Sequence, residues 1–308
     1  MKTHIAGVLL AAGIAAGAAD GGVGFEKQEG LLRVTVGGRH FTDYNFLAER
    51  FPHFDPLIGP TGTNVMRNYP MRTVEGEKTD HPHHRGLWFT HGNVNGHDFW
   101  SNKKGEKIVH AGFVAIDPKA GRFTVSNDWR AGETVVCTDT RTYAFRAAPD
   151  GGAELDFDVT IHASHGEISF NDTKEGSMAI RLATSLQVDK PGAGRIVNSD
   201  GRTDADAWGK RALWCDDSGP LGGETVGVAI LDHPSNPRHP TGWHVRTYGL
   251  FAANPFAMKS FKFSDKDEPF VIPAGKSATF RYRFLFHKGD AKAAGIDARF
   301  RAWAAEGR

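Results

Sequence analysis

Apolar and polar residues alternate along most of this chain with the two-residue period of β-strands. Residues 280–284 read Phe-Arg-Tyr-Arg-Phe, which places the aromatic side chains on one face and the arginines on the other. The glycine pairs at 37–38 and 151–152 are typical of hairpin turns. Strands are predicted over residues 31–36, 40–47, 107–116, 122–129, 134–146, 153–163, 178–188, 225–231, 241–248 and 278–287.

Many short strands with glycine and proline between them predict an all-β fold, an antiparallel β-sandwich. The same pattern fits a large double-sheet architecture, the mutarotase-like supersandwich. Helical periodicity is confined to the C-terminus, where Asp290 is predicted to cap a short helix with Ala293, Ile296, Phe300 and Trp303 along one stripe. We expect that stripe to pack against a sheet.

The first residues have the pattern of a secretory signal peptide. A short basic start precedes the apolar stretch 5–16, and Ala16-Gly17-Ala18 fits the small-x-small cleavage rule. The stretch is shorter than the roughly 20 apolar residues of a membrane span. We therefore predict a signal peptide over residues 1–19, a single β-sandwich domain over residues 20–308, and a periplasmic or secreted location.

Charge and motifs argue against several partners. Lys and Arg number 37 against 36 Asp and Glu, and the chain has no dense basic run of the kind that binds nucleic acid. It has no P-loop, no G-x-S-x-G elbow and no dinucleotide fingerprint, and no later segment is apolar enough to span a membrane. The two cysteines, Cys137 and Cys215, permit a disulfide in an exported chain without requiring one.

Residues 80–100 hold five of the chain's 15 histidines, together with Asp, Arg, Asn and Trp. Histidine exchanges protons near neutral pH and ligates metals as neutral imidazole. Pro82 favours extended geometry for the residue before it, which would place His81 and His83 on one side and His84 on the other. The segment is predicted to form a polar site.

Acid–base chemistry is the first interpretation of this site. His83 or His84 would exchange a proton with the substrate. His244 or Glu175 would be the complementary acid or base. Arg85, Arg181 and Arg246 would stabilise developing negative charge.

Metal binding is the second interpretation, with His81, His83 and His91 as ligands of a divalent metal. The H-x-H pair lacks the Glu that follows it in cupin-type sites, and its spacing differs from zinc-finger patterns. A purely structural, hydrogen-bonded histidine cluster is the third interpretation.

Other polar residues are predicted to line the same cleft and to bind substrate. Three prolines stiffen the segment 232–240, and tryptophans flank the cations at 210–211. Each of these features has a plainer interpretation as a solvated loop or as part of the core. The predicted substrate-binding residues are Arg85, Asn95, Asp98, Trp100, Arg181, Lys210, His233, Arg238, Arg246 and Asn254.

Six motifs together resemble a bacterial protein family of unknown function that carries the label methane oxygenase PmoA-like. They cover residues 80–86, 95–100, 174–176, 208–211, 232–238 and 254–256. The resemblance implies a β-sandwich of carbohydrate-active character and supplies no established reaction.

These observations predict an exported carbohydrate-active enzyme that uses a His/Arg-rich cleft for acid–base chemistry of hydrolase or lyase type. Its partner would be a carbohydrate or another small-molecule substrate. Two alternatives are a metal-dependent enzyme with histidine ligands and a non-catalytic carbohydrate-binding protein. The binding protein would present Trp88, Trp100, Trp208 and Trp243 on an open face.

Overall fold

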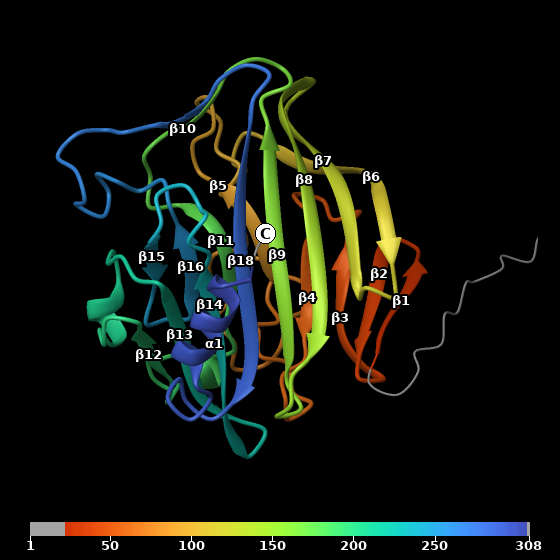
Figure 1. Ribbon diagram of the computed structural model, residues 1–308, viewed down its shortest axis with the longest axis vertical. Coiled ribbons are helices and arrows are strands. Elements are labelled where there is room, and N and C mark those ends of the chain that lie inside the picture. Colours follow the sequence, from red (N-terminus) through yellow and green to blue (C-terminus); the bar gives the residue numbers. More distant parts are fainter. Residues whose placement is uncertain (1–21, 307–308) are drawn as a thin grey trace, which may run out of the picture.

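The computed structural model describes residues 22–306, which form two large antiparallel sheets packed face to face (Figure 1). The first sheet contains, in spatial order, β1 (Val23–Gln28), β2 (Leu31–Val36), β3 (Arg39–Asn45), β4 (His53–Leu57), β5 (Leu87–His91), β11 (Gly176–Arg181), β16 (Leu250–Asn254) and β15 (Gly242–Val245). The second contains β12 (Arg195–Asn198), β13 (Trp214–Leu221), β14 (Glu224–Asp232), β18 (Ser277–Lys288), β9 (Ala153–His162), β8 (Thr134–Ala147), β7 (Arg122–Ala131) and β6 (Lys107–Asp117).

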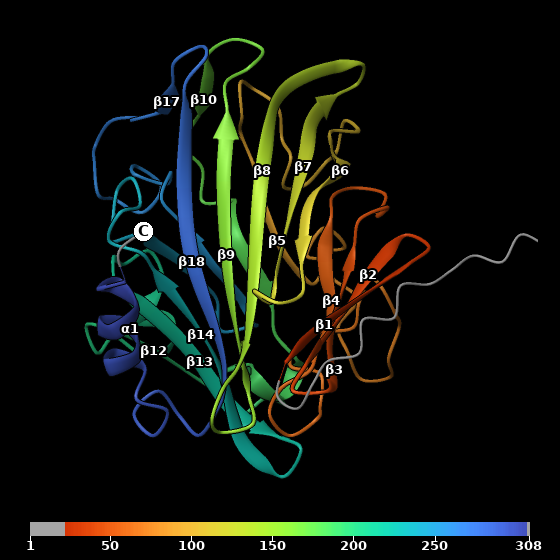
Figure 2. The ribbon, with the colours of Figure 1, turned by 45° about the vertical axis from the view of Figure 1, so that its right-hand side comes forward.

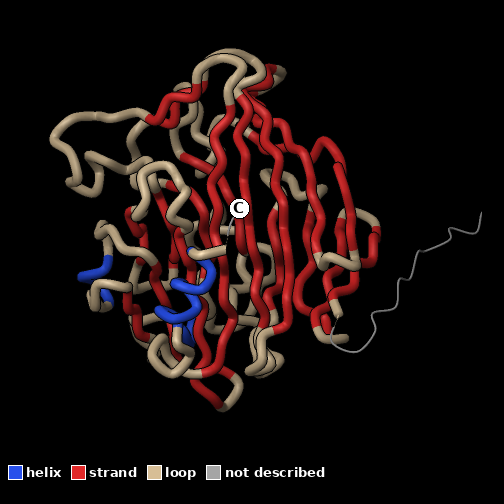
Figure 3. The backbone as a smooth tube through the Cα atoms, viewed as in Figure 1, coloured by secondary structure: helices blue, strands red, loops and turns tan. Residues whose placement is uncertain are grey.

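The remaining elements are short. β10 (Ile168–Phe170) pairs with β17 (Phe270–Ile272), and two 3₁₀ turns, η1 (Thr184–Leu186) and η2 (Asp204–Ala207), lie in loops. The helix α1 (Ile296–Ala304) follows the last strand. Strands dominate the backbone, as Figure 3 shows, and the predicted antiparallel β-sandwich with a short C-terminal helix is confirmed.

Two strands on the site side are shorter than predicted. β11 ends at Arg181 and is followed by η1. β15 ends at Val245, because a tight turn reverses the chain there. Gly249, with φ of 89°, donates its N–H to the Arg246 carbonyl at 2.8 Å to close that turn. Apolar and polar residues still alternate in the sequence across this turn, so the sequence pattern alone does not reveal where the strand ends.

The C-terminal helix begins later than predicted. Asp290 caps a separate turn, since its carboxylate accepts the N–H of Ala293 at 2.8 Å. Gly295, with φ of 63°, then redirects the chain into α1. Ala293 is exposed on the first turn and is not part of the buried stripe. That stripe consists of Ile296, Phe300 and Trp303, which pack on Trp214, Leu231 and Leu285 of the second sheet.

Aromatic side chains fill the space between the sheets. Tyr44 and Phe54 from the first sheet meet Phe123 and Tyr143 from the second. The ring centroids of Phe54 and Tyr143 are 4.8 Å apart, and those of Tyr44 and Phe123 are 5.3 Å apart. Such rings bury large apolar areas and stabilise the contact between the sheets.

A fully buried ion pair also links the two sheets. Arg141 Nη2 donates to Asp139 at 2.7 Å, and the same guanidinium donates to the Phe89 carbonyl of β5 at 3.3 Å. Asp139 further accepts hydrogen bonds from Asn127 and Trp129 at 2.6 and 2.8 Å. These bonds offset the cost of removing both charges from water.

Two further expectations concern the ends and the cysteines. The predicted signal peptide, residues 1–19, lies outside the described residues. Cys137 and Cys215 are both buried and form no disulfide with each other. Within residues 22–306, no helix has both the length and the apolar character needed to cross a lipid bilayer.

Strands β5, β11, β16 and β15 position the candidate site. Across them, Trp88, Ala179, Ala252 and His244 are register partners in one row. Phe89 points the opposite way, into the core, where its ring lies 6.2 Å from that of Trp129. The row therefore lies on the outer face of the first sheet. Figure 2 shows β5 behind β8 and β9 of the second sheet.

Candidate functional site

A column of stacked rings stands on this outer face. Tyr248, His81, His84 and Trp88 follow one another with centroids 5.4, 4.8 and 5.6 Å apart and interplanar angles of 14°, 13° and 25°. Trp100 closes the column from the side, 5.6 Å from His84 and 5.2 Å from Trp88. Rings packed in this way hold the imidazoles in fixed orientations.

Local constraints fold the loop that carries the histidines. The His81 carbonyl accepts hydrogen bonds from the His84 N–H at 3.0 Å and from Arg67 at 3.1 Å. Gly86 has φ of 63°, and a Cβ at that position would lie 2.0 Å from the Phe54 carbonyl oxygen. Because only glycine fits there, the loop can enter β5 directly beside β4.

Two buried arginines converge on one carboxylate. Asp80 accepts hydrogen bonds from Arg67 at 2.5 Å and from Arg181 at 3.3 Å, and His81 Nδ1 lies 3.1 Å away. Although burial raises it, the contacts with His81, Arg181 and Arg67 hold the pKa of Asp80 below its usual value. Burial and the charge of Arg67 lower the pKa of Arg181 to about 10, so Arg181 is still charged at neutral pH.

Arg181 also fixes the protonation of His84. Its Nη1 donates to His84 Nδ1 at 3.1 Å. A guanidinium is only a donor, so Nδ1 carries the lone pair and Nε2 carries the hydrogen. Burial, followed by the charges of His83 and Arg181, lowers the pKa of His84. His84 is therefore a neutral hydrogen-bond donor.

His83 differs from its neighbour. Its ring lies edge-on to His84 at 4.4 Å, and within residues 22–306 no donor or acceptor within 3.5 Å is placed to hydrogen-bond either of its ring nitrogens. Burial and next the charge of His81 lower the pKa of His83 to about 4. At neutral pH, His83 is neutral and its lone pair is available to accept a proton.

Tyr248 completes this group. The Arg181 guanidinium lies over its ring at 4.6 Å. Burial raises the pKa of Tyr248, while the charges of Arg181 and Arg246 act in the opposite direction. The phenol therefore keeps its proton at neutral pH. We call Arg67, Asp80, His81, His83, His84, Arg181 and Tyr248 the His–Arg cluster.

The end of β15 adds a second cation beside Tyr248. Arg246 Nε donates to His244 Nε2 at 3.3 Å, and its guanidinium lies 4.9 Å over the Trp208 ring. Burial, with the charges of Arg246 and Lys174, lowers the pKa of His244 to about 3. His244 is therefore a second neutral imidazole whose lone pair already accepts an arginine N–H.

The loop before β11 brings Glu175 close to the cluster. Glu175 forms an ion pair with Lys174, and its negative charge adds to burial in raising the pKa of Tyr248. Asn254 is buried and holds this loop, since its amide donates to the carbonyls of Thr173 and Lys174 at 3.0 and 3.2 Å. Asn254 is thus placed to fix the loop, whereas the prediction assigned it to substrate.

The predicted metal ligands His81, His83 and His91 are not brought together. Alternation along β5 turns His91 toward the core, where its ring lies 4.9 Å from Phe256 and its Nε2 lies 2.8 Å from the Asn171 carbonyl oxygen. His81 and His83 stand on the opposite face of the sheet. Within residues 22–306, no three His, Cys, Asp or Glu side chains are grouped to hold a metal ion. The structure therefore corrects this ligand set.

Two predicted substrate-binding residues of the proline-rich loop lie away from the cluster. The His233 ring packs 4.8 Å from Trp303 of α1. Arg238 donates to the carbonyls of Pro255 and Glu268 at 3.3 and 2.7 Å, so it holds backbone. The position of this loop relative to the histidines depends on tertiary packing, which the local sequence does not contain.

Asn95 and Asp98 fold the loop after β5. Asn95 accepts the Ser169 N–H at 2.7 Å, and Asp98 accepts the Trp100 N–H at 3.0 Å. Trp100 is fully buried beneath the histidines. Asn95 and Asp98 therefore order the loop backbone, and Trp100 packs against the histidines; their predicted contact with substrate stays a prediction.

Arg85 is half-buried and Lys210 is exposed. Burial and the charge of Arg50 lower the pKa of Arg85, and the charge of Glu49 acts in the opposite direction.

The open tryptophan face expected of a binding protein is not formed. Trp88, Trp100 and Trp243 are fully buried, and Trp208 is half-buried under Arg246. Buried rings have no face to offer to a sugar, so this set of four does not constitute a carbohydrate platform.

Arg67, Asp80 and Tyr248 are the members of the His–Arg cluster that the predicted set omitted. The alternation over residues 241–248 does place Tyr248 on the same face as His244 and Arg246. Arg67 lies in a loop without periodicity, and no local signal distinguishes it from a surface arginine.

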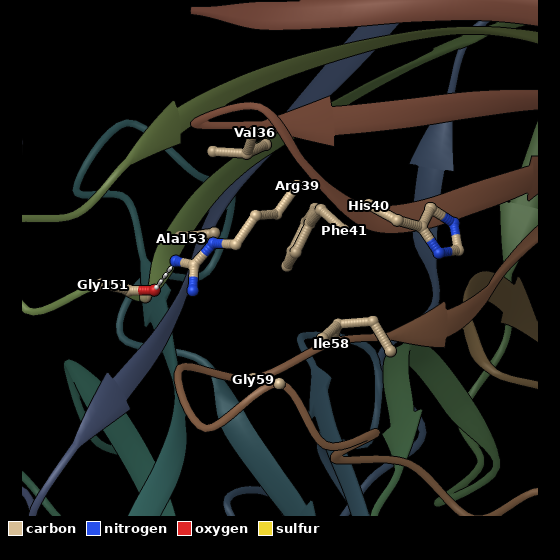
Figure 4. A pocket seen from close by; sticks show the side chains of 10 residues that line it. Val36, Arg39, His40, Phe41, Ile58, Gly59, Gly151 and Ala153 are labelled. Carbon is tan, nitrogen blue, oxygen red and sulfur yellow. Dashed lines mark hydrogen bonds between the residues drawn. The ribbon is translucent and has the colours of Figure 1, made fainter. Parts of the chain in front are cut away.

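A cavity of about 340 Å³ lies elsewhere, between the β2–β3 hairpin, the loop after β4 and the β8–β9 turn (Figure 4). Arg39 crosses its mouth and donates to the Gly151 carbonyl at 3.0 Å. His40 and Ile58 form its opposite side. None of the predicted site residues lines this cavity, so it is a feature separate from the His–Arg cluster.

Three solved protein structures are among those that align with this chain. A polysaccharide lyase aligns with 11% identity and a TM-score of 0.35, over 82% of this chain and 32% of that chain. A heparan sulfate lyase, HepC from Pedobacter heparinus, aligns with 7% identity and a TM-score of 0.34, over 88% and 36%. A 4-alpha-glucanotransferase from Thermococcus litoralis aligns with 13% identity and a TM-score of 0.25, over 85% and 37%.

The chain spans about a third of the length of these solved proteins. No curated protein matches it. Residues 31–301 match a family described as a family of unknown function, DUF6807. The match runs from the first sheet to α1, and the chain therefore belongs to this family of unknown function.

Proposed function

We propose that this protein is an exported carbohydrate-active enzyme, of hydrolase or lyase type, whose reaction centre is the His–Arg cluster. The contrast between His83 and His84 carries the proposal. Their rings lie 4.4 Å apart, yet Arg181 makes one a fixed donor while the other keeps an unbonded lone pair. Such a separation of roles between neighbouring titratable groups is typical of acid–base sites.

His83 is the proton acceptor in this proposal. It is neutral at neutral pH because its pKa is lowered to about 4. Tyr248 is the proton donor, since burial raises the pKa of its phenol and keeps it protonated. Both rings flank His81, at 5.7 Å for His83 and 5.4 Å for Tyr248, and the proposal places one sugar unit between them.

Charge stabilisation comes from the donors around them. Arg181 is held by Asp80 and by His84, so its cation is fixed before substrate arrives. The Nε2–H of His84 is a second preorganised donor. Donors fixed in a buried setting stabilise negative charge in a transition state more than mobile ones do.

The other predicted acid–base residues have supporting roles. The His244 lone pair accepts from Arg246, and Glu175 is paired with Lys174. We therefore propose that His244 and Glu175 shape the electrostatic field around Tyr248. The direct proton transfers are carried out by His83 and Tyr248. Export is supported by the signal-peptide pattern of residues 1–19.

A glycan screen on the chain without residues 1–19 tests the proposal, with reducing ends as the readout for hydrolysis and unsaturated sugar products for elimination. We expect His83→Gln to lose at least about 100-fold in kcat on any substrate found. His165→Gln is the matched control, because His165 is exposed on another loop. Full activity in His83→Gln would refute the assignment.

A further inference from the structure

The His–Arg cluster and its neighbour Arg246 have more positive charge than their carboxylates balance. Arg67 and Arg181 are each 1% exposed and share one ion-pair partner, Asp80. The histidines add no negative charge. The chain as a whole has a net charge of only +1, so this excess is local. Buried cations that outnumber their partners are suited to an anionic ligand.

Arg246 is the clearest case. Within residues 22–306, no carboxylate lies within 4.0 Å of its guanidinium, which stacks 4.9 Å over Trp208 and donates its Nε to His244. These two contacts fix the plane of the fork. No hydrogen bond within the same residues engages the terminal Nη nitrogens of Arg246, which leaves a preformed pair of donors.

Tyr248 lies next to both arginines: the Arg181 guanidinium is 4.6 Å over its ring, and Arg246 precedes it by two residues in the turn that the Gly249 N–H closes on the Arg246 carbonyl at 2.8 Å. The charges of both arginines oppose the upward shift of the Tyr248 pKa, while Glu175 and Asp80 add to it. Glu175 is already neutralised by Lys174.

Farther along the site, three further cations act on His83. After burial and His81, the charges of Arg50, Lys103 and Arg67 lower its pKa. Glu77, the other carboxylate near Arg67, accepts hydrogen bonds from the backbone N–H groups of Asn68 and Tyr69.

We propose that Arg246 forms a subsite for the carboxylate of an acidic sugar, with the buried charge of Arg181 adding to the positive field, so that the substrate contains uronic acid units. This inference rests on the proposed function and names its substrate class. A carboxylate matches the planar fork of arginine and can accept two parallel N–H bonds. The Tyr248 hydroxyl and the Nε2–H of His84 would then lie beside the sugar ring that bears it.

Calorimetric titration of the chain without residues 1–19 tests the subsite without requiring turnover. The probes are the methyl glycosides of glucuronic and galacturonic acid, their methyl esters, and methyl glucoside carrying a 6-sulfate. We expect the acids to bind and esterification to weaken binding by about tenfold or more, because a charge-assisted bond is lost. Arg246→Gln should cause a similar loss.

Arg39→Gln is the matched control, since Arg39 is exposed at the separate cavity. Equal affinity for acid and ester, or an unchanged affinity in Arg246→Gln, would overturn the subsite. Sulfate binding as tight as the carboxylate would overturn the assignment to a uronic acid. So would the failure of every probe to bind at concentrations on the order of 10 mM.

The subsite and the proposed function fail separately. Binding of the acids with the expected losses, but without turnover of any glycan, supports the subsite and refutes the reaction. Turnover that depends on His83, with the same kcat/KM for neutral and acidic glycans, supports the reaction and refutes the subsite.

Discussion

Two regions of this molecule gather the same kinds of side chain and pair them differently. Beneath α1, His233 and Arg283 pack against Trp303, at 4.8 and 5.2 Å. Arg283 there donates to Asp156 at 2.6 Å and to Glu306 at 3.2 Å, and Glu154 lies 3.9 Å away, so the cation has three carboxylate partners. In the His–Arg cluster, by contrast, two buried arginines share one carboxylate.

The difference shows which property marks a site. Histidine, arginine and tryptophan occur in both regions, so residue type does not distinguish them. Compensated charges stabilise the fold, whereas uncompensated charges and imidazoles with lowered pKa values are kept at a cost in stability. Substitutions in the two regions are therefore expected to affect different measurements.

The largest expected effect is on stability, beneath α1. The Asp156 carboxylate pairs with Arg283 at 2.6 Å and with Arg146 at 2.7 Å. Asp156→Asn removes this shared charge and should lower the free energy of unfolding by about 3 kcal/mol. Urea denaturation measures it. The control is Asp267→Asn, which removes an exposed ion pair with Lys259 and should change stability by less than about 1 kcal/mol. Equal effects of the two variants would contradict the account.

The next effect is on activity, in the cluster. Arg181→Met should reduce kcat by about 100-fold, because a fixed donor to developing negative charge is lost. Its stability should fall less than that of Asp156→Asn, since removing Arg181 relieves repulsion from Arg67. Paired kinetics and urea denaturation make the comparison. A variant that unfolds as readily as Asp156→Asn, with kcat unchanged, would assign Arg181 to the fold alone.

The smallest effect is the pH dependence of stability. The folded-state pKa values of His83 and His244 are about 4 and 3, below the ordinary value near 6.5. The folded state therefore binds fewer protons, so stability is complete above about pH 6.5 and is lost as pH falls toward 4. His83→Gln should reduce the stability lost between pH 6.5 and pH 4 by on the order of 1 kcal/mol, and His165→Gln should not. Identical slopes in both would contradict the lowered pKa of His83.

Much of the fold follows from local patterns. Alternation in residues such as Phe280 and Arg281 predicts β18, and glycine pairs predict the hairpins. The start of α1 was missed because the decisive residue, Gly295, adopts a left-handed conformation that capping rules do not reveal. Both faces of β5 are buried, so its sequence lacks the alternation of apolar and polar residues that identifies a strand.

The candidate site was predictable only in part. The histidine run is visible because packing rarely requires such a composition. His91 was predicted on the wrong face of β5, because neighbouring residues of a strand point to opposite faces of the sheet. The positions of Arg67 and His233 depend on contacts between segments far apart in the chain, which no local pattern contains.

The most direct test compares one histidine from each region. His83→Gln and His233→Gln are assayed side by side on the same glycan, with kcat referred to the concentration of folded protein. The account predicts that His83→Gln loses at least about 100-fold while His233→Gln keeps the wild-type kcat. Loss of turnover in His233→Gln with His83→Gln fully active would contradict it and move the reaction centre to α1.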